Sequence, residues 1–181
     1  LSGQRPAPAP QLLLDGRPLM EWSAQQRATA IAVVPQEPFI RATTLRDNLL
    51  LGREISQQHL SRVLHIAHLA LLVDSLPLGL DTLLGERGLS LSTGERQLLA
   101  LGRALVTTPR VLLLDEATAS IDSHTEALLQ QALHELRGEV TLIVVAHRLA
   151  TVRDADRLLV LEQGCITQLG AHDAPMAEPG L

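Results

Sequence analysis

The sequence predicts an α/β fold built on a parallel sheet. Two apolar runs, Val111–Leu114 and Val140–Ala146, have the length and composition of strands, and their unbroken apolar character is typical of strands buried on both faces. A helical pattern lies between them, and its apolar stripe is expected to face the core: Leu129, Ala132, Leu133 and Leu136. Strand, helix and strand in this order, with apolar strands, indicate a parallel sheet.

The elements before Val111 follow from turn residues and spacing. Gln11–Leu14 is an apolar run that stops at Asp15-Gly16, a dipeptide that favours a hairpin turn. Ala30–Val34 is a strand candidate that ends at Pro35. From Thr43 to Leu84 the apolar spacing becomes helical, and Ser56 is a candidate N-cap.

The elements after Leu114 are predicted in the same way. Either Asp122 or Ser123 begins the helix, with Glu126 completing a capping box on Ser123. Further on, Arg157–Leu161 and Cys165–Leu169 flank Gln163-Gly164, which indicates a second hairpin.

Composition excludes several classes of function. The net charge of −5 argues against nucleic acid as a partner, because such surfaces need clustered cations. A single cysteine excludes an internal disulfide and a cysteine-based metal framework. All 15 basic residues are arginines, so the sequence contains no lysine to bind a phosphate or form a Schiff base.

Two adjacent carboxylates, Asp115 and Glu116, follow the first buried strand. They are expected at the carboxyl edge of the sheet, where parallel sheets bind ligands. An aspartate there can hold Mg²⁺, and the following glutamate can orient or deprotonate an attacking water. The alternative is a strand that ends in a solvated acidic turn.

Neighbouring segments add to this pattern. Ser92 and Gly94 stand at the start of a helix, where a hydroxyl and free backbone N–H groups make an anion site. Asp122 follows in the loop after the acidic pair, and His147 follows the next strand. A histidine in that place is expected at the same sheet edge as Glu116, although a solvated polar residue is the plainer interpretation.

The order of these segments resembles the nucleotide-binding domain of ABC transporters, over residues from about Leu12 to Met176. The resemblance implies ATP and Mg²⁺ as cofactors and gives the matching residues their roles. Gln36, in the Q-loop, would contact Mg²⁺ and the attacking water, and Asp115 would hold Mg²⁺. Glu116 would be the general base, and His147 the switch histidine on the γ-phosphate. Ser92 and Gly94, in the signature motif, and Asp122 would contact nucleotide across a dimer.

One further segment distinguishes between branches of this family. Leu84–Gly88 resembles the X-loop typical of exporters, and Thr118–Asp122 resembles the multidrug-like heterodimeric exporters of bacteria. The resemblance implies a transmembrane domain and a second nucleotide-binding domain as partners, at the cytoplasmic face of the inner (plasma) membrane. A soluble ABC ATPase of DNA repair is disfavoured by the acidic charge, by the absence of a coiled-coil insertion and by residues Gly85–Gly88.

The implied fold is a P-loop NTPase-type parallel sheet core with an α-helical signature subdomain. We expect that subdomain at about residues 43–105 and half of the catalytic core at 106–171, within one partial domain over 1–181. The family's glycine-rich loop ending in Gly-Lys-Ser/Thr, with its strands, has no counterpart here. We therefore expect an amino-terminally truncated domain that binds no ATP alone and is poorly soluble because a strand is left uncovered.

The signature motif also departs from the usual pattern, with Thr93 and Glu95 where glycine and glutamine are usual. This indicates either a degenerate composite site, as heterodimeric exporters have, or a neutral change. A second function also stays open, that of a regulatory partner without a P-loop that completes a composite site in trans.

Overall fold

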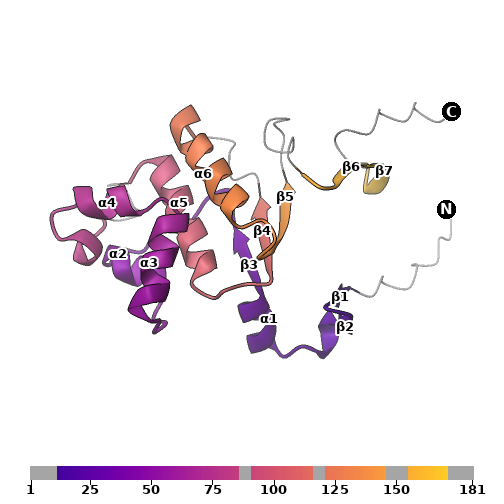
Figure 1. Cartoon of the computed structure of the whole chain (residues 1–181), viewed down its shortest axis with the longest axis horizontal. Coiled ribbons are helices and arrows are strands. Elements are labelled where there is room, and N and C mark those ends of the chain that lie inside the picture. The colour runs from indigo at the N-terminus through magenta and orange to yellow at the C-terminus, as the bar shows by residue number, and fades with distance from the viewer. Residues whose placement is uncertain (1–11, 86–90, 116–120, 146–154, 171–181) are drawn as a thin grey trace, which may run out of the picture.

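A computed structural model describes residues 12–85, 91–115, 121–145 and 155–170. Figure 1 shows three regions: a group of helices, α2 to α5, on one side; a central sheet with α6 across it; and two short hairpins on the other side. None of the helices in these ranges has both the length and the apolarity needed to cross a lipid bilayer.

The central sheet has three parallel strands in the order β3-β4-β5: Ile31–Val34, Val111–Asp115 and Thr141–Val145. Helix α6, Ser123–Glu135, connects β4 to β5 and lies across the sheet (Figure 1). Its predicted stripe is buried, with Leu129 and Ala132 fully inaccessible. The predicted α/β fold with a parallel sheet is confirmed.

Short helices fill the segment between Thr43 and Leu84, as the spacing predicts. These are α2, Leu45–Leu50; α3, Gln57–Ile66; α4, Ala70–Ser75; and the 3₁₀ turn η2, Gly79–Asp81. Ser56 is the N-cap of α3, and its hydroxyl accepts from the backbone N–H of His59. The division of the chain into a helical subdomain, 43–105, and half of a catalytic core, 106–171, stays a prediction. One hydrophobic cluster includes residues from both ranges.

Helix α5, Thr93–Leu105, joins the small helices to the sheet. Gly102 of this helix packs closely against Leu49 and Leu69, because a Cβ on Gly102 would lie 2.8 Å from Leu49 Cδ1 and 2.9 Å from Leu69 Cδ1. On other faces of α5, Leu99 and Leu101 are completely buried. The helix is therefore part of the core along most of its length.

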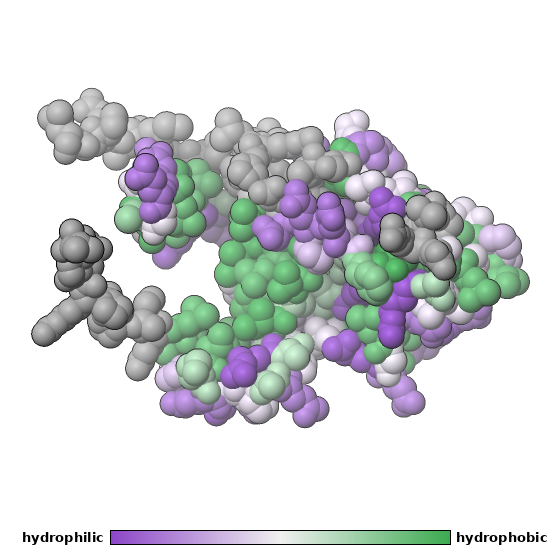
Figure 2. Space-filling model, turned by 180° about the vertical axis from the view of Figure 1, so that it is seen from behind, coloured by the Kyte–Doolittle hydropathy of each residue, from purple (hydrophilic) through white to green (hydrophobic). Residues whose placement is uncertain are grey.

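The two faces of the sheet differ, which corrects the expectation that the strands are buried on both. Ala32, Val34, Leu112 and Leu114 are buried on the face toward the helices. On the opposite face Val33, Ile143 and Val145 are 53%, 47% and 51% exposed. Figure 2 shows apolar residues gathered on this side of the molecule. The reason is that α5 and α6 cover one face only, while the strand sequences are apolar on both.

The remaining elements are a helix and two hairpins. Strands β1, Leu13–Leu14, and β2, Arg17–Pro18, pair across Asp15-Gly16, and both turn residues have positive φ, as a tight hairpin turn requires. The 3₁₀ turn η1, Leu19–Glu21, and helix α1, Ala24–Ala30, follow. Strands β6, Leu158–Glu162, and β7, Cys165–Gly170, pair across Gln163-Gly164. Both predicted hairpins are confirmed. Helix α1 was not predicted, and its last residue, Ala30, lies where the sequence predicts the first residue of β3.

Candidate active site

The carboxyl ends of the three strands meet at one edge of the sheet. Val34 is in register with Leu114, and Asp115 with Val145, so β3, β4 and β5 end side by side. Asp115 is exposed at this edge. Glu116 and His147, which follow β4 and β5 in the sequence, lie outside the described residues.

Gln36, the predicted Q-loop residue, comes two positions after the end of β3 and is exposed. Its backbone carbonyl accepts a hydrogen bond from the side-chain amide of Gln97 at 2.5 Å. Gln97 belongs to α5 and is only 2% exposed, while its own Oε1 is buried without a partner in the described structure. A buried amide therefore fixes the backbone of Gln36 to α5.

Ser92 is the N-cap of α5. Its Oγ accepts from the backbone N–H of Glu95 at 3.1 Å, and the Glu95 carboxylate accepts from the backbone N–H of Ser92 at 2.7 Å, which completes a capping box. Because the hydroxyl accepts in this box, its own proton stays free to donate to an anion. Glu95 thus stabilises the helix start, a role that a glutamine would also fill, so the two interpretations of Glu95 remain open.

Asp122 is the N-cap of α6 and fixes the start of that helix. Its Oδ1 accepts from the backbone N–H groups of His124 and Thr125, both at 3.0 Å, and its Oδ2 accepts from the Thr125 hydroxyl at 2.8 Å. These bonds, that from the Thr125 N–H first, lower the pKa of Asp122 below its ordinary value. Of the two candidate caps, Asp122 is correct; the capping box expected between Ser123 and Glu126 does not describe this helix start.

The first turns of α5 and α6 are packed against each other. A Cβ built on Gly94 would lie 2.5 Å from Thr125 Oγ1 and 2.6 Å from Thr125 Cγ2. Real Cβ atoms do not approach other heavy atoms so closely, so only glycine fits here without a shift. This contact brings the segment of Ser92 and the cap of Asp122 together, although they lie far apart in the sequence.

The donor set at the sheet edge suits a magnesium ion held largely by water and phosphate. No group of three or more His, Cys, Asp or Glu side chains occurs in the part of the chain that the structure describes, so it offers no closed protein cage. Mg²⁺ needs only one or two carboxylates beside phosphate oxygens, and Asp115 is an accessible carboxylate in the expected place. These 181 residues contain no lysine, so none of them supplies a lysine to the triphosphate.

Comparison with known proteins identifies the family. The profile of the ABC transporter family matches residues 1–119 of the chain. The chain belongs to the ABC transporter family. The match covers β3, α5 and β4 of this ABC domain, with Gln36, Ser92, Gly94 and Asp115 among its residues.

Individual relatives agree. The chain is 42% identical over 180 residues to the multidrug resistance-like ATP-binding protein MdlB of Buchnera aphidicola, covering 99% of this chain and 31% of that protein. It is 42% identical over 168 residues to ABC transporter B family member 1 of Arabidopsis thaliana, covering 90% of this chain and 13% of that protein. This ABC chain therefore spans less than a third of the length of these relatives.

A solved structure supports the fold. The structure of a bacterial Atm1-family ABC exporter with ATP bound superposes with a TM-score of 0.80 and 36% identity, covering 88% of this chain and 28% of that one. The predicted fold class and the predicted family, the ATP-binding domain of ABC exporters, are confirmed.

Three residues that shape this candidate site were not predicted from the sequence. Gln97 is a polar residue inside an apolar helix stripe, and only the fold shows that it contacts Gln36. Thr125 is the third residue after the Asp122 cap, and its contact with Gly94 is not visible in local patterns. The role of Glu95 could have been read from the sequence, because Ser92 and Glu95 have capping-box spacing.

Proposed function

We propose that this chain acts within an ABC exporter, where ATP hydrolysis at its site is coupled to the export of a substrate. The observation that supports this best is the register of the sheet, which ends β3, β4 and β5 side by side. Three segments that the family uses in hydrolysis, those of Gln36, Asp115-Glu116 and His147, continue from these three strand ends.

The proposed roles follow the chemistry of each side chain. Asp115 would hold Mg²⁺, which when bound neutralises phosphate charge, and Gln36 would contact the same ion and the attacking water. Glu116 would accept the proton of that water, and His147 would contact the γ-phosphate. Gln97 would limit the movement of Gln36, because it holds the backbone carbonyl of that residue.

The signature segment would serve a nucleotide bound to another subunit. Ser92 is exposed, keeps its hydroxyl proton available, and stands at the N-terminus of a 13-residue helix, which favours phosphate oxygens. Asp122 is the second residue that would act across the dimer. The proposed partners are therefore a second nucleotide-binding domain and a transmembrane domain, at the cytoplasmic face of the inner (plasma) membrane.

A second candidate function rests on the signature segment, where the exposed Ser92 begins helix α5. As a regulatory partner, the chain could complete a composite site in trans through Ser92 and Gly94 alone. In this case Glu116 would have no reaction to catalyse.

One experiment tests both functions. ATP hydrolysis is measured for the membrane assembly that contains this chain, reconstituted in liposomes, with Glu116→Gln and Ser92→Ala compared with the unchanged protein. If the chain hydrolyses ATP, Glu116→Gln lowers turnover by about 100-fold or more while nucleotide still binds. If the chain only completes a site in trans, Glu116→Gln has no effect and Ser92→Ala lowers turnover. Full activity of both variants contradicts both proposals.

The control is Ser123→Ala. Ser123 is exposed at the start of α6 beside Asp122 and is not its cap, so its removal should leave turnover unchanged.

A further inference from the structure

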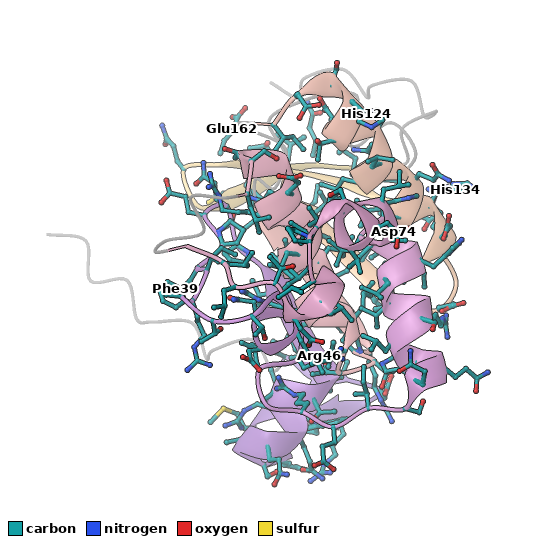
Figure 3. All side chains as sticks on the ribbon, turned by 90° about the vertical axis from the view of Figure 1, so that its left-hand side faces the viewer. Phe39, Arg46, Asp74, His124, His134 and Glu162 are labelled. Atoms are coloured by element: carbon teal, nitrogen blue, oxygen red, sulfur yellow. The ribbon has the colours of Figure 1, made fainter. Side chains whose placement is uncertain are left out.

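Thr125 is a buried polar residue that touches both Asp122 and Gly94. Its side chain belongs to the first turn of α6, and the residue is 8% exposed. Figure 3 labels its neighbour His124 near one end of α6 and His134 near the other, which locates this turn in the molecule. A buried hydroxyl needs a hydrogen-bond partner, and Thr125 has one in Asp122.

On one side, Thr125 holds the carboxylate of Asp122. Its hydroxyl donates to Oδ2 at 2.8 Å and its backbone N–H donates to Oδ1 at 3.0 Å. Both oxygens of Asp122 are thereby directed by a single residue, so the plane of the carboxylate is fixed. Hydrogen bonds to an ionised group are stronger than those between neutral groups.

On the other side, Thr125 lies against the backbone of the signature segment. The position that a Cβ on Gly94 would take is 2.6 Å from Thr125 Cγ2 and 2.8 Å from its Cβ. Thr125 is β-branched and its hydroxyl is held by Asp122, so its side chain has little freedom to rotate away. The threonine therefore sets the distance between the first turns of α5 and α6.

We propose that Thr125 is a positioning residue: it orients the Asp122 carboxylate and itself packs against Gly94, so that the segments of Ser92 and Asp122 act as one unit. This inference rests on the proposed function, since it assumes that Asp122 and the signature segment both act at the dimer interface. The lowered pKa of Asp122 is consistent with it, because the two largest contributions come from the N–H and the hydroxyl of Thr125.

The test compares Thr125→Val, which keeps the shape and loses the hydroxyl, with Thr125→Ser, which keeps the hydroxyl and loses a methyl group. In the reconstituted membrane assembly, Thr125→Val should lower kcat about tenfold with little change in the KM for ATP, a scale set by the loss of one charge-assisted hydrogen bond. Thr125→Ser should retain most of the kcat. The exposed neighbour Ser123→Ala is the matched control.

Two outcomes of this assay overturn the inference. One is a Thr125→Val protein with unchanged kcat. The other is an equal loss of kcat and of Tm in both variants, which means that Thr125 matters for packing alone.

A second measurement separates this inference from the proposed function. The pKa of Asp122 is followed by ¹³C NMR of its labelled carboxyl group in the detergent-solubilised assembly that contains this chain. Thr125→Val should raise this pKa and Thr125→Ser should not. If the assembly with unchanged sequence hydrolyses no ATP, the proposed function fails, and the NMR result still decides the orientation of Asp122. An unchanged pKa in Thr125→Val refutes the positioning role.

Discussion

Replacing Gly94 by alanine measures how tightly the first turns of α5 and α6 are packed. The new Cβ would lie within 2.5, 2.6 and 2.8 Å of three atoms of Thr125. Overpacking of this kind in a filled core costs about 1–3 kcal/mol. Part of this cost is offset because alanine favours the helical conformation more than glycine does, by up to ~1 kcal/mol inside a helix and by less in the first turn. We expect Gly94→Ala to lower the free energy of unfolding by about 1–2 kcal/mol.

The same helix provides a matched control, Gly102→Ala. The atoms nearest to a Cβ on Gly102 are the terminal methyl groups of Leu49 and Leu69, at 2.8 and 2.9 Å, and leucine ends can rotate. Gly102 also lies in the helix interior, where alanine is favoured over glycine by up to about 1 kcal/mol. Gly102→Ala is therefore expected to stay within about 1 kcal/mol of the unchanged chain.

The assay is urea unfolding followed by circular dichroism, with the midpoint compared at constant m. A double variant makes it more specific: Thr125→Ala removes the two nearest atoms, so Gly94→Ala should be less damaging in that background, by about 0.5 kcal/mol or more. The reasoning is refuted if Gly94→Ala is as stable as Gly102→Ala, or if the double variant shows purely additive losses.

Three other predictions concern charge, nucleotide and association. The folded-state pKa of Asp122 is lowered, so its stabilising contribution is present above about pH 4, its unfolded pKa, and is lost as pH falls through the folded pKa. The stability difference between the unchanged chain and Asp122→Asn should thus shrink on acidification, and a constant difference in acid unfolding curves contradicts this. The 181-residue chain alone should bind Mg-ATP more weakly than about 1 mM, because these residues supply none of the about four charge-assisted bonds that a phosphate-binding loop makes. Micromolar binding in calorimetry refutes this. The exposed sheet face should make the chain self-associate at about 100 µM in sedimentation velocity, and the double variant Ile143→Thr, Val145→Thr should associate less. An unchanged chain that stays monomeric contradicts this prediction.

Local signals predict much of this fold. Asp15-Gly16 and Gln163-Gly164 both form their turns, because two residues with positive φ are needed and these dipeptides accept them. Ser56 begins α3 as predicted. Helix α1 has an equally local signal, the capping box of Ser23 and Gln26, so the sequence also specifies where this helix begins.

Other features depend on the assembled fold. The apolar strands β4 and β5 predict two buried faces, but the pattern of a strand does not specify which element covers each face. The contact of Gly94 with Thr125 and the bond from Gln97 to Gln36 join distant segments, and no spacing rule predicts them. For the candidate site, the order of strands and polar residues predicts that Gln36 and Asp115 follow strands that end at the same edge of the sheet, and the register agrees. Glu116 and His147 lie outside the described residues.

Helix α5 has a genetic consequence that follows from its contacts. It holds the backbone of Gln36 through Gln97, the first turn of α6 through Gly94, and the backbone and side chain of Asn48 through Arg103. Its 13 residues rise about 1.5 Å each, so these contacts lie along a rod of about 20 Å. Second-site suppressors of a damaged α5 should therefore map to three separate segments of the chain, near Gln36, Asn48 and Thr125.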